Sequence, residues 1–221
     1  YMIDRKIHNV FLKFKEGLPI ESIPIFTQQV SKTRQFCLSN DIIYKMWTEV
    51  DCNELINKYP QYKELYENFR EEIQKIDFIR YLILYHEGGI YLDCDVCPIN
   101  NMNDLFELDE FFVRWNDDKK QLPYIAVLGS VAKSKLYEDI LRHCEESYIE
   151  KSKMSIYTSW IGRFVFQTTG HYMVNRVLKK YKNVPKLDIL KINSKQGTII
   201  QGDNPIFEDF NISEWFKPKN K

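Results

Sequence analysis

The sequence lacks an excess of charge, a long apolar run and a regular spacing of cysteines. Lysine and arginine together number 31, as do aspartate and glutamate, whereas nucleic-acid-binding domains are normally basic. We therefore expect no nucleic-acid partner. No apolar run has the length that crosses a bilayer, and the five cysteines show no disulfide framework. These absences predict a cytoplasmic protein with at most peripheral contact at the inner face of the membrane.

The composition that remains is that of a globular protein. The chain has 221 residues, of which 44% are hydrophobic and 14% aromatic, so we expect one domain over residues 1–221. Strand-like and helix-like stretches alternate, which predicts an α/β fold with ligands beyond the carboxyl ends of the strands. The capping-box pattern of Asp51 and Glu54 indicates a helix start. We expect strands at 6–14, 42–47, 111–115, 125–128, 189–192 and 198–201, and helices at 25–32, 62–86, 134–148, 159–166 and 171–181.

The most informative segment runs from Glu87 to Val96. Two glycines end a helix and a short apolar strand follows, which carries Asp93 and Asp95 with one residue between them. Strand residues alternate between faces, so the two carboxylates are expected to point the same way and Cys94 the other. Hard oxygen ligands of this kind suit Mn²⁺ or Mg²⁺, an ion commonly shared with a phosphate-bearing substrate. The pattern therefore predicts metal-assisted chemistry on a diphosphate.

The helix before this segment carries Asp77 and Arg80, three residues apart. That spacing places both side chains on one face of the helix. A surface ion pair is the simplest structural interpretation. Because the helix leads through Gly88 and Gly89 directly to Asp93, we favour a functional role beside the metal site.

The segments 77–85 and 88–95 together resemble the core signature of the DXD-containing sugar transferases. That family includes bacterial capsular-polysaccharide glycosyltransferases and yeast initiating mannosyltransferases, with clostridial glucosylating toxins as distant relatives. The resemblance implies a GT-A-type domain with a mixed central sheet flanked by helices. It also implies transfer of a hexose from a nucleoside-diphosphate sugar, with a UDP-sugar favoured over a GDP-sugar. Retention of anomeric configuration is implied as well, and the acceptor would be a glycan or lipid-linked oligosaccharide in capsule, O-antigen or other polysaccharide synthesis.

The resemblance also implies roles for individual residues. Asp95 would bind the metal directly, and Asp93 would hold metal-bound water or ribose. Asp77 would accept hydrogen bonds from ribose or donor-sugar hydroxyls, while Arg80 would orient the donor sugar or Asp93. Tyr91 would pack or hydrogen-bond near the ribose.

Similarity to the family extends toward both ends of the chain. Residues 7–11 resemble its first strand, which makes Val10 and Phe11 donor-binding positions, with Phe11 where relatives stack an aromatic ring on the base. Ser213 and Trp215 resemble the toxin Ser-x-Trp segment, in which Ser helps to bind the metal and Trp contacts the leaving phosphate. The acidic residue expected before that Ser is displaced by one position, to Asp209.

Two other interpretations remain open at this point. Haloacid-dehalogenase-like phosphatases also place a D-x-D motif after an apolar strand, but there the motif opens the domain and its first Asp is the nucleophile. A non-catalytic nucleotide-sugar-binding module would keep the same residues without turnover. Loss of metal-dependent sugar transfer on replacement of Asp95 separates the enzyme from both.

Overall fold

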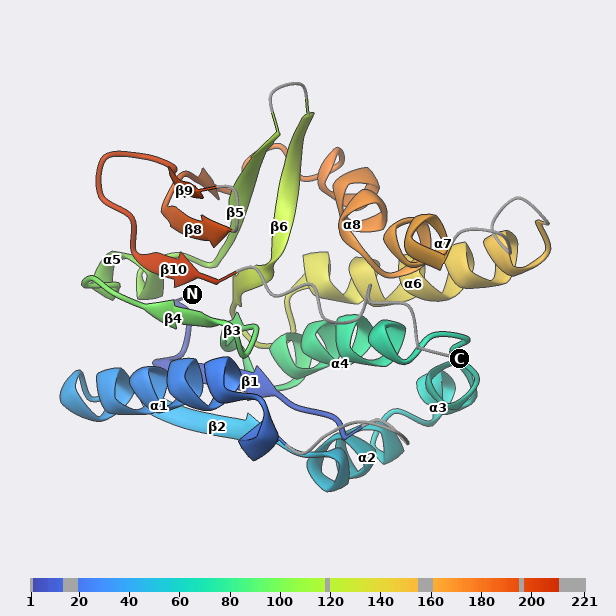
Figure 1. Cartoon of the computed structure of the whole chain (residues 1–221). Coiled ribbons are helices and arrows are strands. Elements are labelled where there is room, and N and C mark those ends of the chain that lie inside the picture. The colour runs from blue at the N-terminus through green and yellow to red at the C-terminus, as the bar shows by residue number, and fades with distance from the viewer. Residues whose placement is uncertain (1, 14–19, 118–119, 155–160, 195–196, 211–221) are drawn as a thin grey trace.

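Two β-sheets organise the fold, and the chain passes from one to the other directly after residue 92 (Figure 1). The computed structural model describes residues 2–13, 20–117, 120–154, 161–194 and 197–210. Its first sheet is six-stranded and its second four-stranded within these ranges. The predicted α/β class with a mixed central sheet is confirmed.

The first sheet has the strand order β2-β1-β3-β6-β5-β7. Its β1, β2 and β3 are parallel, whereas β6 is antiparallel to both β3 and β5. The strands are β1 (Lys6–Val10), β2 (Ile43–Trp47), β3 (Gly89–Leu92), β5 (Glu110–Asp117), β6 (Lys120–Ser130) and β7 (Lys186–Leu187). The carboxyl ends of the three parallel strands therefore meet at one edge, where ligands bind in α/β sheets.

The second sheet has the order β4-β10-β8-β9. Its strands are β4 (Val96–Pro98), β8 (Leu190–Ser194), β9 (Gly197–Ile200) and β10 (Phe207–Asp209). β10 is antiparallel to β4 and parallel to β8. Only residues 93–95 separate β3 from β4, so this short connection joins the two sheets.

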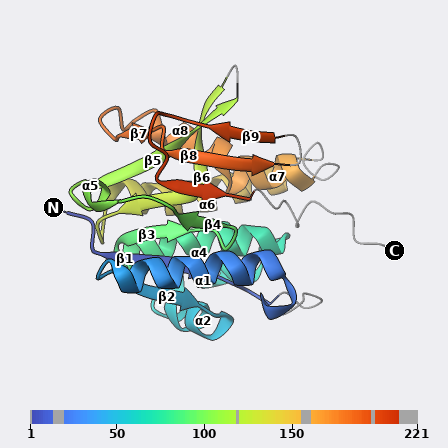
Figure 2. The same ribbon diagram turned by 60° about the vertical axis from the view of Figure 1, so that its left-hand side comes forward.

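Helices cover the first sheet on both faces. Tyr91, Phe112 and Leu128 point into a core shared with α2, α3, α4, α6 and α8. Ile90 and Phe111, one position away, point into a second core with α1, α5 and the second sheet. Figure 2 shows α1 and the second sheet on the near side, with α4 and α6 behind them. The helices are η1 (Ile20–Ser22), α1 (Pro24–Ser39), α2 (Glu49–Asn57), α3 (Pro60–Glu67), α4 (Glu72–Glu87), α5 (Asn103–Phe106), α6 (Lys135–Ser152), α7 (Ile161–Thr168) and α8 (His171–Leu178).

The two glycines between α4 and β3 are required by the backbone. Gly88 and Gly89 have φ values of 68° and 95°, a region that other residues rarely adopt. A Cβ on Gly89 would lie 2.9 Å from the His8 ring and from the Lys6 carbonyl. The buried His8 ring accepts from Trp47 and donates through Nε2 to the Gly88 carbonyl. Thus β1 and β2 fix the point where α4 ends.

A wide bulge interrupts the pairing of β5 with β6. Phe112 pairs with Leu128, but the next residue, Val113, pairs with Tyr124. Residues 125–127 of β6 therefore have no partner on β5, which leaves their backbone groups for other uses. Bulges of this kind commonly redirect backbone or side chains next to functional sites.

Several sequence predictions need correction at the level of element boundaries. The first strand ends at Val10 rather than at residue 14, and the helix expected over 62–86 is two helices separated at residues 68–71. The capping box of α2 is formed by Thr48 and Asp51, not by Asp51 and Glu54. The threonine hydroxyl and the carboxylate satisfy each other's backbone N–H, and neither pattern is distinguishable before the helix start is known.

Gly129 tests the packing of this hairpin. It pairs with Phe111, whose ring occupies the space that a Cβ would fill. Gly129→Ala should lower the free energy of unfolding by about 2 kcal/mol through overpacking. The additional Phe111→Leu exchange should recover part of that loss, so the double variant is less destabilised than the sum of the single variants in urea unfolding. Strictly additive losses would contradict this contact.

Candidate active site

The two acidic residues of the D-x-D motif lie in a turn rather than on a strand. β3 ends at Leu92, and the Val96 amide donates to the Asp93 carbonyl at 3.0 Å, which closes the turn. Asp93 and Asp95 are half-buried, whereas Cys94 is buried and its thiol donates to the Val10 carbonyl. Residues 93–95 were expected to alternate in exposure because they lie on a strand, and that reason is wrong. A turn, not a strand, buries the middle residue and leaves its two neighbours partly exposed.

Arg80 of α4 joins the two acidic positions of the site. Its Nη2 lies 3.0 Å from Asp77 Oδ1 and its Nη1 lies 3.2 Å from Asp93 Oδ1. Nη1 also donates to the Ile125 carbonyl in the β6 bulge at 2.9 Å. The side chains of Arg80 and Asp77 are only 3% and 4% exposed, against 31% for Asp93. Of these three, Asp93 is therefore the group that reaches solvent.

The second oxygen of Asp77 is held from another element. Thr169, just beyond α7, donates its hydroxyl to Asp77 Oδ2 at 2.9 Å. Burial raises the pKa of Asp77 to about 6, and the Arg80 charge and the Thr169 hydrogen bond limit that rise. The carboxylate is consequently ionised at neutral pH and anchored at both oxygens.

Tyr91 of β3 completes the contacts of Asp93. Its hydroxyl donates to Asp93 Oδ1 at 2.5 Å, and Arg80 lies 4.8 Å above its ring. Burial raises the pKa of Tyr91 well above its ordinary value, so the hydroxyl stays protonated and remains a donor. Burial alone would lower the pKa of Arg80, but Asp93, Tyr91 and Asp77 raise it, and the guanidinium stays charged.

A buried residue of β1, Asn9, supports the turn and was not identified from the sequence. Asn9 donates to the Leu92 carbonyl at 2.6 Å and accepts from the Tyr44 hydroxyl at 2.8 Å. His8, one position earlier in β1, is fully buried, and burial lowers its pKa to about 4. An asparagine within an apolar strand was the available signal, because a buried amide needs partners.

The other residues predicted to bind the sugar donor or the metal differ in their burial. Val10 is buried, and its carbonyl bonds Cys94. Phe11 is half-buried and packs edge-on against Phe26 of α1, with ring centres 6.4 Å apart. Asp209 is buried in β10, opposite Val96. The Ser213 and Trp215 predictions lie outside the described residues.

The donor set can be compared with the needs of the implied Mn²⁺ or Mg²⁺ ion. Within the described ranges no group of three or more His, Cys, Asp or Glu side chains is arranged to hold a metal. Asp93 and Asp95 would supply oxygen ligands at a partly exposed turn. One or two carboxylates fit an ion that completes its shell with water and substrate phosphates, whereas an all-protein cage needs more ligands.

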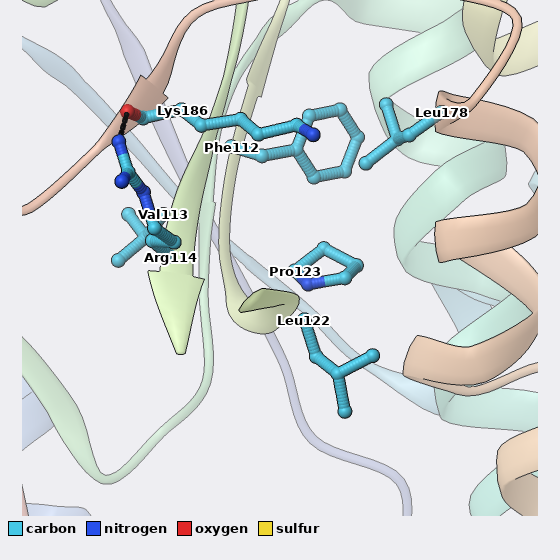
Figure 3. Close-up of a pocket in the computed structure, with 7 residues that line it drawn as sticks. All are labelled: Phe112, Val113, Arg114, Leu122, Pro123, Leu178 and Lys186. Carbon is cyan, nitrogen blue, oxygen red and sulfur yellow. Dashed lines mark hydrogen bonds between the residues drawn. The ribbon is translucent and has the colours of Figure 1, made fainter. Parts of the chain in front are cut away.

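A shallow surface depression lies elsewhere, between the β5–β6 hairpin and α8 (Figure 3). None of the predicted site residues lines it. Its lining residues are Phe112, Val113, Arg114, Leu122, Pro123, Leu178 and Lys186.

Comparison with known families agrees with the site. A family model described as the glycosyltransferase sugar-binding region containing a DXD motif matches residues 20–112. That range includes the turn and its partners Asp77, Arg80, Asp93 and Asp95. Residues 20–112, less than half of the chain, are thus similar to this family of glycosyltransferases. No helix in the described part of the chain is both long and apolar enough to cross a membrane.

Curated proteins similar to this chain align over different lengths. An uncharacterized glycosyltransferase of Acanthamoeba polyphaga mimivirus is 28% identical over 88% of this chain and 72% of its own length. Mannosyl phosphorylinositol ceramide synthase of Saccharomyces cerevisiae is 28% identical over 72% of this chain and 40% of its own. An inositol phosphoceramide mannosyltransferase of Schizosaccharomyces pombe is 42% identical over 60 residues, 27% of this chain and 17% of its own. The chain thus spans less than half of these yeast relatives.

Solved structures confirm the GT-A-like fold. The PaToxG glycosyltransferase has a TM-score of 0.53 and 16% identity, over 81% of this chain and 70% of that one. The ligand-free glycosyltransferase domain of the YGT toxin has a TM-score of 0.51 and 8% identity, over 84% and 79%. At these identities the likeness shows the fold alone.

The buried ion pair of Asp77 and Arg80 should make the free energy of unfolding depend on pH. Because the native pKa of Asp77 is raised above its unfolded value, the native state binds more protons between about pH 4 and 6, and stability falls as pH rises through that window. Arg80→Met removes the neighbouring cation, so the pKa of Asp77 should rise further and extend this loss above pH 6.

In urea unfolding at pH 8, we expect Arg80→Met to lower the free energy of unfolding by about 3 kcal/mol or more. Part of this loss should be recovered at pH 5.5, where Asp77 is protonated. Asp77→Asn/Arg80→Met lacks the buried carboxyl and serves as the control, without that recovery. Parallel pH profiles for the two variants would show that Asp77 is not the titrating group.

Proposed function

We propose that this glycosyltransferase moves a hexose from a nucleoside-diphosphate sugar to a glycan or lipid-carried acceptor, with a divalent ion at Asp93 and Asp95. The observation that carries the proposal is the state of Asp93. Arg80 and Tyr91 hold one of its oxygens from inside the protein, while the side chain remains 31% exposed. A carboxylate that is held by buried side chains and is also partly exposed to solvent is suited to an ion that is shared with a diphosphate.

Each residue then has a task that follows from its contacts. Asp93 and Asp95 would hold the ion, which supplies charge neutralisation for the departing diphosphate when bound. Arg80, buried and charged, orients Asp93 rather than meeting the diphosphate itself. Asp77, ionised and anchored at both oxygens, would accept a hydrogen bond from a hydroxyl of the nucleoside-diphosphate sugar. Phe11 is the proposed base-stacking residue at the end of β1.

We further propose that transfer retains the anomeric configuration without an enzyme nucleophile. Asp77 is bonded to Arg80 and Thr169, and Asp93 to Arg80 and Tyr91. The buried Cys94 thiol has a pKa raised well above its ordinary value by burial and by the adjacent carboxylates, which disfavours the thiolate. Each of these three groups is therefore constrained as a nucleophile.

The donor and acceptor are narrowed by the names of the relatives. The yeast relatives are named as a mannosyl phosphorylinositol ceramide synthase and an inositol phosphoceramide mannosyltransferase. These names make mannose the first sugar to test and a phosphoinositol-type lipid the first acceptor. A UDP-sugar remains the prediction from the sequence, and polysaccharide synthesis remains the alternative acceptor setting. The contacts of Asp93 disfavour the phosphatase alternative, because a carboxylate bonded to Arg80 and Tyr91 is a weakened nucleophile.

Donor binding and turnover test the proposal together. A panel of UDP- and GDP-hexoses, including both mannose donors, should raise the melting temperature only for the correct donor and only with Mn²⁺ or Mg²⁺. The same donor should be hydrolysed or transferred, and Asp95→Asn should lower that rate at least about 100-fold. Asp104→Asn, on the exposed surface of α5, is the matched control and should leave the rate unchanged.

The alternatives give different results in that experiment. A metal-dependent shift without any turnover would identify a binding module. Release of phosphate from phosphomonoesters, without sugar-nucleotide turnover, would support the phosphatase instead.

Tyr91→Phe isolates the hydroxyl bonded to Asp93. The ring remains to fill the core, so the melting temperature should change little, whereas the Mn²⁺ concentration for half-maximal activity should rise about 10-fold or more. Tyr137→Phe is the matched control, because the buried Tyr137 hydroxyl has no hydrogen-bond partner among the described residues. Equal Mn²⁺ dependence in both variants would mean that Tyr91 does not prepare Asp93.

A further inference from the structure

The corner between α7 and α8 is fastened to one face of α4. Gln74, Asp77 and Tyr81 are spaced three and four residues apart, which aligns them along one side of the helix. Gln74 Nε2 donates to the Thr168 hydroxyl at 2.7 Å, Thr169 donates to Asp77 at 2.9 Å, and the Tyr81 hydroxyl donates to the Thr169 carbonyl at 2.8 Å. All three contacts are buried, so the corner has a fixed position relative to Asp77.

The two threonines of this corner have different consequences for the site. The Thr168 hydroxyl also donates to the Phe164 carbonyl within α7, so its bonds are confined to the packing of α7 on α4. The Thr169 hydroxyl instead ends on Asp77 Oδ2, while Arg80 holds Oδ1. A carboxylate group rotates in a broad, roughly two-fold well, and anchors on both oxygens restrict that rotation.

We propose that Thr169 is a positioning residue that orients Asp77 for its contact with the donor sugar. This inference rests on the proposed function, because it assigns Thr169 a task in sugar transfer. Thr169 touches no donor atom in this scheme and acts only through Asp77. The segment 168–170 therefore contributes to the site through the Thr169 side chain.

The surroundings of Asp77 determine how the effect is detected. The charged or titratable groups around it are Arg80 and Tyr81 of α4, Asp93 of the turn and Cys144 of α6. Of these, Arg80 favours the ionised carboxyl and Asp93 opposes it. The Thr169 hydrogen bond also favours ionisation, so its loss should move the acidic limb of the kcat/KM profile upward from about pH 6.

The test compares Thr169→Val, Thr169→Ser and Thr168→Val in donor turnover from pH 5.5 to 9. Thr169→Val should lower kcat/KM at pH 7 about 10-fold to 100-fold and shift the acidic limb upward, with partial recovery at pH 9. Thr169→Ser should keep kcat/KM within about threefold of the wild type and leave the acidic limb in place, because serine keeps the hydroxyl that donates to Asp77. Thr168→Val loses comparable buried hydrogen bonds and should lose stability without moving the limb.

Two results would overturn the inference. The first is an acidic limb and a kcat/KM in Thr169→Val equal to those of Thr168→Val, with wild-type turnover intact; this rejects the role of Thr169 alone. The second is the absence of donor turnover in the wild type, which rejects the proposed function as well. If Thr169→Val does not fold, Thr169→Cys fills the same space with a weak donor and should give an intermediate shift; a wild-type limb there would also reject the role.

Discussion

The guanidinium of Arg80 lies in the protein interior and contacts Asp77, Asp93 and the Ile125 carbonyl. A buried cation is tolerated only when its hydrogen-bonding groups are satisfied by well-placed partners. This requirement links three elements that are distant in sequence, namely α4, the turn after β3 and the bulge of β6. The ion pairs need not add net stability, but they restrict where Asp93 can lie, and the candidate metal site depends on that restriction.

The turn at 93–95 is also where the chain leaves one sheet for the other. The Asp93 amide donates to the Ala126 carbonyl at 2.9 Å, and the Phe210 amide donates to the Asp95 carbonyl at 3.2 Å. The first sheet therefore holds one end of the turn and the strand β10 the other. Cys94, buried between them, bonds β1. The backbone of the motif is fixed on several sides, which leaves the two carboxylates as its groups nearest to solvent.

Local patterns were sufficient for the central block and insufficient for what surrounds it. The spacing of Asp77 and Arg80 and the two glycines before β3 predicted the helix, its end and the strand, because each depends on nearest neighbours in sequence. The turn at Asp93 and the bond from Thr169 to Asp77 depend on contacts across 33 and 92 residues. No periodicity encodes such contacts.

Arg80 is proposed to orient Asp93 without itself contacting the metal ion or the nucleotide. Calorimetric titration of Mn²⁺ with UDP or GDP into wild type and Arg80→Lys tests this most directly. Lysine keeps the charge but lacks the planar fork that reaches Asp77, Asp93 and the carbonyl together. With the variant shown to be folded, the account predicts metal-dependent nucleotide affinity at least about 10-fold weaker than in the wild type. Equal affinity in a folded Arg80→Lys would contradict it.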